Sequence, residues 1–178
     1  ARRGLPNLAS LVDAVPALTT EKAVKLFTKF GIYTQSELEA RADIMYETYV
    51  KTIKIEANTM IHMAAKHYIP TVIGYTTRLA QSITAVASAC PEAELSVQRG
   101  LLKDVSARLA EASAALEQLK PLMDRVDAIQ DVKEMAIAYR TAVVPAMDAL
   151  RYPIDQLELM VDKSIWPVPT YGDLMFEV

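Results

Sequence analysis

The sequence predicts an all-α protein, an up-down bundle of long antiparallel helices that bend at their prolines. Two observations carry this prediction. Apolar residues make up 52% of the 178 residues while glycine occurs only 5 times, a composition typical of packed helices. In three long segments the apolar residues also recur three and four positions apart, which is the spacing of one helix face. A chain of this length suits one domain with a sizeable core.

The first 18 residues are predicted to form an extended or turn-rich arm. They contain Pro6 and Pro16 and show no sustained apolar period. Their leucines still need burial, so we expect the arm to lie across an apolar surface. The bundle itself is expected over residues 19–165. It opens with a short helix that Thr20 caps and that Gly31 ends in a left-handed conformation.

The longest predicted helix runs from Thr34 to Pro70. Thr34 and Glu37 form a capping box, in which each side chain satisfies a backbone donor of the other residue. At ~1.5 Å per residue such a helix is roughly 50 Å long and needs packing partners along its length. The predicted apolar stripe consists of Leu38, Ala42, Met45, Tyr49, Ile53, Ala57, Met60, Ala64 and Tyr68.

Two further long helices are predicted after a helical continuation that ends at Pro91. The first extends to about residue 129 with a heptad-like seam, and the second begins at the Asp131 cap and extends to about residue 163. The short connection between them forces an antiparallel pair. Bends are expected at Pro70, Pro121, Pro145 and Pro153. The core is predicted to include Leu109, Leu116, Tyr139, Leu150, Ile53 and Met60.

Residues 166–178 break the helical pattern but are rich in aromatic and apolar side chains. Prolines restrict the backbone and lower the entropy lost on ordering, so we expect an ordered docking tail. Its candidate interface residues are Trp166, Pro167, Pro169, Tyr171, Gly172, Asp173 and Phe176.

Charge and cysteine content disfavour several classes of partner. The net charge is −3 with both signs interspersed, so no basic stripe is available for nucleic acid. The longest uncharged runs are shorter than the ~18 apolar residues of a membrane span. Cys90 is the single cysteine, which excludes an intrachain disulfide and suits the reducing cytoplasm.

A search for reactive or metal-binding residues predicts no catalytic, cofactor or metal site. His62 and His67 are five positions apart, which separates them around an α-helix, unlike the i,i+4 pair of helical zinc sites. Cys90 is interpreted as a small buried residue. Lys51, Lys54 and Glu56 are a candidate charged site, although such residues are common on exposed helix faces.

Two stretches resemble a known family. The tail WPVPTYGDLMF, residues 166–176, resembles the closing signature of type III glutamine synthetases. The stretch YVKTIKIEA, residues 49–57, resembles the motif near the start of that family's C-terminal helical region. Residues 5–8, 26–31 and 150–151 fit in the same order, so the resemblance covers nearly the whole chain. Ala42 and Asp43 depart from the pattern near the helix start, where an aromatic residue is expected.

The resemblance implies a role within a longer enzyme. Type III enzymes are long chains in which an upstream catalytic region joins ammonia to glutamate with ATP and magnesium, and a helical region follows. The family's catalytic motifs have no matching positions here, so we expect a non-catalytic segment that packs on that upstream region and supports or regulates a homo-oligomeric ring. Whether Ala1 is a true start or a fragment boundary stays open. A free-standing helical interaction module is the alternative, which an upstream open reading frame would exclude.

Overall fold

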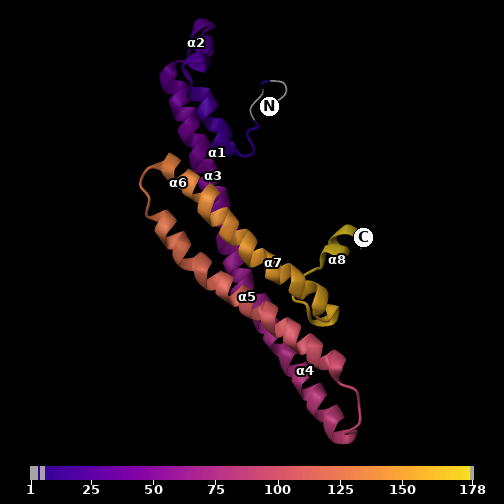
Figure 1. Ribbon diagram of the computed structural model, residues 1–178. Coiled ribbons are helices and arrows are strands. Elements are labelled where there is room, and N and C mark those ends of the chain that lie inside the picture. The colour runs from indigo at the N-terminus through magenta and orange to yellow at the C-terminus, as the bar shows by residue number, and fades with distance from the viewer. Residues whose placement is uncertain (1–3, 5–6, 177–178) are drawn as a thin grey trace. The chain divides into compact units, whose positions relative to one another are not determined.

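A computed structural model describes residue 4 and residues 7–176, and these residues form helices and loops without any strand (Figure 1). The all-α prediction is confirmed. The chain divides into two compact units. The first consists of Ala1–Ala57 with Leu122–Pro145, and the second of Asn58–Pro121 with Ala146–Val178. The expected division into an arm, one bundle and a tail stays a prediction.

The first unit begins with helical turns where an extended arm was expected. Helix α1 spans Leu11–Ala14 and continues as a 3₁₀ helix over Val15–Thr19. Ser10 caps α1, because its Oγ accepts a hydrogen bond from the Asp13 amide at 3.2 Å. Pro16 lies in the first turn of the 3₁₀ helix, where its missing N–H leaves no bond unmade. Residues 11–18 of the predicted arm are therefore helical and not extended; residues 1–3 and 5–6 lie outside the described part.

The next two helices begin and end as the sequence predicts. Helix α2 spans Glu21–Lys29 and ends at Gly31, which has a φ of 61°. Helix α3 spans Gln35–Met63. At its start the Thr34 amide donates to Glu37 Oε2 at 2.7 Å and the Glu37 amide donates to Thr34 Oγ1 at 3.3 Å, so the capping box is confirmed. The amide of the cap residue Thr34 and one amide of the first turn of α3 are thereby satisfied.

The buried face of α3 in the first unit is slightly rotated from the predicted stripe. Leu38, Ala42 and Ala57 are buried as expected. Between them Tyr46 and Val50 are buried, whereas Met45 is 37% exposed. Successive steps of four residues follow the i±4 ridge of the helix, and both ridges fit the sequence because each position is apolar. The partner surface decided between them.

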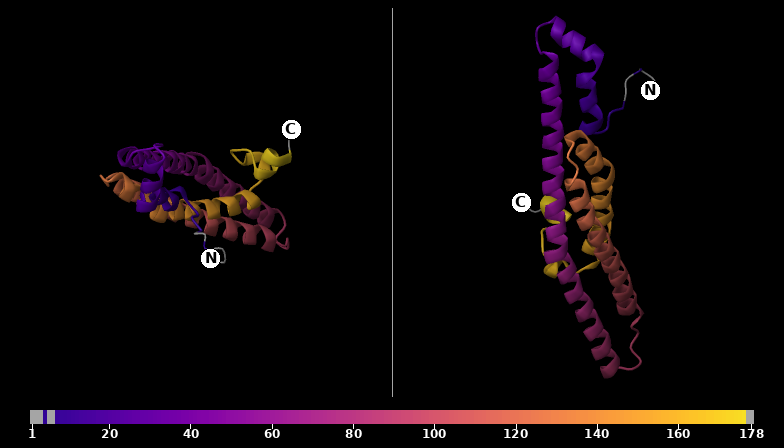
Figure 2. Two further views of the ribbon diagram at one scale, coloured as in Figure 1. Left: turned by 90° about the horizontal axis from the view of Figure 1, so that it is seen from above. Right: turned by 90° about the vertical axis from the view of Figure 1, so that its left-hand side faces the viewer.

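The second unit contains a helical hairpin of α4 (Ile69–Ala89) and α5 (Ser96–Asp127), whose α5 residues belong to this unit up to Pro121 (Figures 1 and 2). The α5 seam is confirmed over most of its length. Leu102 and Leu109 are only half-buried. The other six predicted seam positions are buried: Val105, Ala112, Leu116, Leu119, Met123 and Val126.

Two prolines lie two residues after the end of a π turn. One π turn spans Ala64–Tyr68 ahead of Pro70, and the other spans Tyr139–Val143 ahead of Pro145. In each turn an amide donates to the carbonyl five residues back, from Ile69 to Ala64 and from Val144 to Tyr139. A proline ring clashes with the carbonyl four residues back, so a wider turn relieves the clash. Pro121 and Pro153 lie inside ordinary α-helix. Bending at the four prolines stays a prediction.

The remaining elements follow the predicted order. Helix α6 (Val132–Ala138) is capped by Asp131, whose Oδ1 accepts from the Glu134 amide at 2.8 Å. Helix α7 spans Val144–Met160, a 3₁₀ helix spans Lys163–Ile165, and α8 spans Tyr171–Phe176. In the described part of the chain, no helix is both long and apolar enough to cross a bilayer. Of the predicted core residues, Leu116, Tyr139 and Leu150 are buried, and Leu109, Ile53 and Met60 are half-buried.

Candidate functional site

The first half of the C-terminal tail is packed onto the second unit. Trp166 is only 7% exposed, and its ring stacks on Tyr68 with 5.2 Å between centroids and 26° between planes. Asp162 positions the preceding 3₁₀ helix by accepting from the Ser164 amide at 2.8 Å. The indole Nε1–H is buried and meets no hydrogen-bond acceptor among the described residues. Packing, and not polar contact, therefore holds the indole.

The second half of the tail is ordered by its own capping contacts. The Thr170 amide donates to Asp173 Oδ2 at 2.7 Å, and the Asp173 amide donates to Thr170 Oγ1 at 3.2 Å. Lys163 forms an ion pair with the other oxygen of Asp173. Asp173 thus joins the start of α8 to the 3₁₀ helix before Trp166. Pro167 is half-buried, Pro169 and Gly172 are exposed, and α8 begins at Tyr171.

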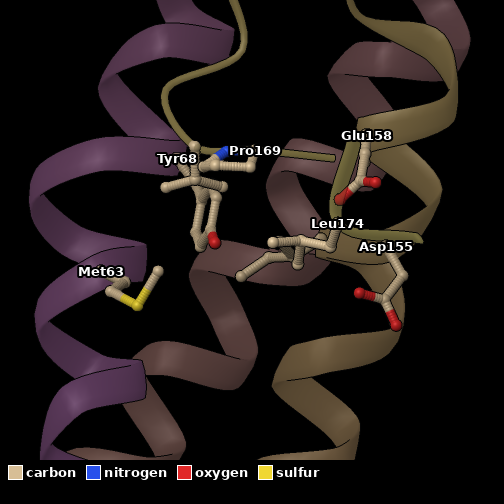
Figure 3. Close-up of a pocket in the computed structure, with 8 residues that line it drawn as sticks. Met63, Tyr68, Asp155, Glu158, Pro169 and Leu174 are labelled. Carbon is tan, nitrogen blue, oxygen red and sulfur yellow. The ribbon is translucent and has the colours of Figure 1, made fainter. Parts of the chain in front are cut away.

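A cavity of about 410 Å³ lies beside this tail in the second unit (Figure 3). Tyr68 and the tail residue Leu174 point into it, and the carboxyl groups of Asp155 and Glu158 on α7 line one side. Asp155 accepts from Arg151 Nε at 3.3 Å. Carboxylates repel phosphate, so this side of the cavity disfavours a nucleotide. The residues that line the cavity are Met63, Tyr68, Ile154, Asp155, Glu158, Val168, Pro169 and Leu174.

Helix α8 presents three consecutive apolar side chains to solvent. Leu174 is 72% exposed, Met175 70% and Phe176 79%. Phe176 was expected to dock together with Trp166, but the structure buries Trp166 and exposes Phe176. The capping contacts fix α8 without covering these three side chains. We call Leu174, Met175 and Phe176 the α8 apolar cluster.

The three charged residues predicted on α3 do not converge. Lys51 pairs with Glu47 at 2.9 Å, one turn earlier on the same exposed face. Lys54 reaches Asp127 at the end of α5, with 2.8 Å between Nζ and Oδ2. Glu56 is exposed. Only Lys54 makes a contact between elements, and that contact lies within the first unit.

Tyr139 completes the Lys54 contact. It is fully buried, and its hydroxyl donates to Asp127 Oδ1 at 2.6 Å. Burial opposes ionisation of Asp127, but hydrogen bonds from Lys54 and Tyr139 outweigh it and lower the Asp127 pKa. Burial, and then the bond to Asp127, raise the pKa of Tyr139. The sequence pattern placed Tyr139 in the core but identified no partner for its hydroxyl. A buried tyrosine hydroxyl usually has a hydrogen-bond partner, so the predicted burial was the signal that a partner exists.

Comparison with known proteins places the chain. The family model described as "Glutamine synthetase C-terminal domain" matches residues 1–87. A glutamine synthetase of Butyrivibrio fibrisolvens is 32% identical over 178 residues, which is 100% of this chain and 25% of the relative. The type-3 glutamine synthetase of Dictyostelium discoideum is 29% identical over 178 residues, 98% of this chain and 24% of the relative. The chain is homologous to the C-terminal region of type 3 glutamine synthetases.

The family model and the related proteins match different lengths of the chain. The glutamine synthetase of Bacteroides fragilis strain YCH46 is 27% identical over 180 residues, which is 99% of this chain and 25% of the relative. The chain thus spans about a quarter of the length of these curated glutamine synthetases. The family model ends at residue 87, so it includes the Lys54 stretch, while the tail is covered by the alignments with the relatives.

Two sequence interpretations outside the tail are corrected by the structure. His62 and His67 were expected on different helix faces, but their ring centroids are 5.7 Å apart with 65° between the planes. The π turn between them is the cause, because it adds one residue to the turn. Cys90 is exposed and not buried. It ends α4 next to Pro91, where the chain leaves the helical core.

Proposed function

We propose that this chain is the non-catalytic C-terminal helical domain of a type 3 glutamine synthetase. In that proposal the longer protein is a cytoplasmic glutamate–ammonia ligase, and the residues that bind ATP, magnesium and glutamate lie upstream of this region. Almost the whole chain is homologous to a region that makes up about a quarter of each relative. This extent supports a segment that occupies the same place in a longer protein. The domain would serve packing, homo-oligomer assembly or its regulation.

The observation that carries the proposal is the contrast within the tail. Trp166 is buried while the residues of the α8 apolar cluster are each at least 70% exposed on a helix that is already capped. Exposed apolar area is unfavourable by roughly 25 cal/mol per Å², and a preformed helix loses little entropy on binding. We infer that the α8 apolar cluster packs against the upstream region of the longer chain.

The first test concerns activity. The 178-residue chain, given glutamate, ammonia, ATP and magnesium, is expected to release no phosphate above a no-enzyme control. The sequence contains no glycine-rich phosphate-binding motif, and the described residues hold no cluster of three or more potential metal ligands. Turnover that follows the purified chain through chromatography would contradict the non-catalytic assignment.

The second test concerns docking in the longer protein. Met175→Ser with Phe176→Ser is expected to lower the thermal midpoint of the longer enzyme or release smaller species on sizing, while the isolated 178-residue chain melts unchanged, since both side chains are exposed and neither lines the cavity. Val97→Ser is the matched control, since Val97 is 77% exposed on α5 and should leave both proteins unchanged. An unchanged assembly and melt in the double variant would contradict the docking role. If no upstream coding region exists, the chain is a free-standing interaction module instead.

A further inference from the structure

His62 and His67 form an exposed pair whose closeness depends on the π turn. In an α-helix of about 3.6 residues per turn, positions five apart lie about 140° apart around the axis. The π turn Ala64–Tyr68 places an extra residue between them, so the i,i+5 pair here occupies a common face. Their ring centroids are 5.7 Å apart and both side chains are exposed.

This geometry resembles that of paired histidine ligands. Two histidines on one helix face bind zinc in helical metal sites, where the spacing is i,i+4. With zinc–nitrogen distances of about 2.0–2.1 Å, two imidazoles that share an ion have ring centres about 5–6 Å apart. The observed separation falls in that range without any backbone movement. Because the rings face solvent, water would complete the coordination shell.

We propose that His62 and His67 form a bidentate site for a late first-row divalent ion, with zinc, nickel and copper as the ions that imidazole prefers. The described residues hold no third His, Cys, Asp or Glu in a cluster with them, so the site is two-ligand and open. Such a site binds an ion reversibly and does not act as a buried structural centre.

Ion binding at this pair selects the π conformation. If the turn reverted to α-helix, the two rings would separate around the axis and the chelate would be lost. An ion therefore stabilises the π turn by its difference in affinity for the two conformations. Tyr68 is the last residue of the same turn and stacks on Trp166. The ion would accordingly stabilise the surface on which the first half of the tail packs.

Calorimetric titration with zinc tests the proposal. The parent should carry Cys90→Ser, because the exposed thiol is a competing ligand. We expect one zinc ion per chain. His62→Ala and His67→Ala should each weaken binding by at least about 10- to 100-fold, since losing a direct ligand costs no less than losing an outer-shell partner. Lys66→Ala, which removes an exposed neighbouring charge, should not weaken binding.

Thermal unfolding supplies a second measurement. Zinc should raise the midpoint of the Cys90→Ser parent and leave that of His67→Ala unchanged, because only an ion that binds the folded form adds stability. Far-UV circular dichroism, and the gentler variants His62→Gln and His67→Gln, establish that loss of binding is not loss of fold. Zinc affinity equal in the parent and in both histidine variants, or no binding by the folded parent, would overturn the site.

Discussion

The two π turns each hold a tyrosine, and the two tyrosines are fixed in opposite ways. Tyr139, in the first unit, is fully buried, and its hydroxyl donates to Asp127. Tyr68, in the second unit, is half-buried, and its ring stacks on Trp166. Both turns precede a proline, so the same backbone requirement produced both. A π turn thus fixes where a side chain lies, and the residues around that side chain decide which interaction it makes.

The two environments should respond differently to solution conditions. The Tyr139 cluster contains two ionised partners, Lys54 and Asp127, and so depends on pH and salt. The Tyr68–Trp166 stack contains no charge and should be indifferent to both.

The largest expected effect is that of Tyr139→Ala. Removing a fully buried aromatic side chain should lower the free energy of unfolding by about 3–5 kcal/mol through lost burial and a cavity. Chemical denaturation measures it. Tyr152→Ala is the matched control, because Tyr152 is 59% exposed and should change stability little. Similar losses in the two variants would show that the Tyr139 cluster does not stabilise the first unit.

Trp166→Ala should have the next largest effect, about 3 kcal/mol, at the lower end of the range for removing a core aromatic side chain, because Trp166 is 7% exposed whereas Tyr139 is fully buried. Trp166→Phe should lose clearly less, because phenylalanine keeps an aromatic ring on Tyr68 and removes an indole N–H that meets no acceptor among the described residues. Denaturant melts of both variants measure the difference. A Phe variant as unstable as the Ala variant would mean that the indole N–H does find a partner.

Asp127 should contribute a pH-dependent part of the stability of the first unit. Because the folded-state pKa of Asp127 is lowered, its stabilisation is present above the unfolded value of about 4 and is lost as pH falls through the folded value. The raised pKa of Tyr139 acts at the other end, with stabilisation kept below about pH 10 and lost above it. Melts of the parent and Asp127→Asn should therefore differ at pH 7, and the difference should shrink as the pH falls below about 4. A constant difference would refute this.

Lys54→Ala should have the smallest effect, about 0.2–1 kcal/mol, because the Lys54 side chain is 46% exposed and solvent screens the pair. Added salt should reduce the difference further. Lys51→Ala, which breaks only a pair within α3, should cost no more. A Lys54 effect that persists in high salt would indicate that packing of its aliphatic chain, and not charge, is responsible.

Local sequence rules predicted the helix starts and the α5 seam well. Three of these predictions were the caps at Thr34 and Asp131 and the left-handed Gly31. Each depends only on residues within four positions in the sequence, and all three are present. The choice between Met45 and Tyr46 on α3 was not predictable, because both are apolar and the packing partner is distant in sequence.

The candidate site was predictable only in outline. The composition of the tail predicted order, and Trp166 and Asp173 make ordering contacts. The composition of the tail could not distinguish the buried Trp166 from the exposed Phe176, since both are aromatic. The histidine pair was missed because the spacing rule assumed a uniform α-helix, whereas the proline three residues after His67 signals a local change of pitch.

The exposure of Cys90 has a practical consequence. The chain contains one cysteine and one tryptophan, and both belong to the second unit. A fluorescent dye attached to the Cys90 thiol would accept excitation energy from Trp166 and from no other indole. The efficiency of that transfer would act as an optical ruler inside one folded unit. It would report whether the tail stays in place when zinc, or the upstream region of a longer enzyme, is added.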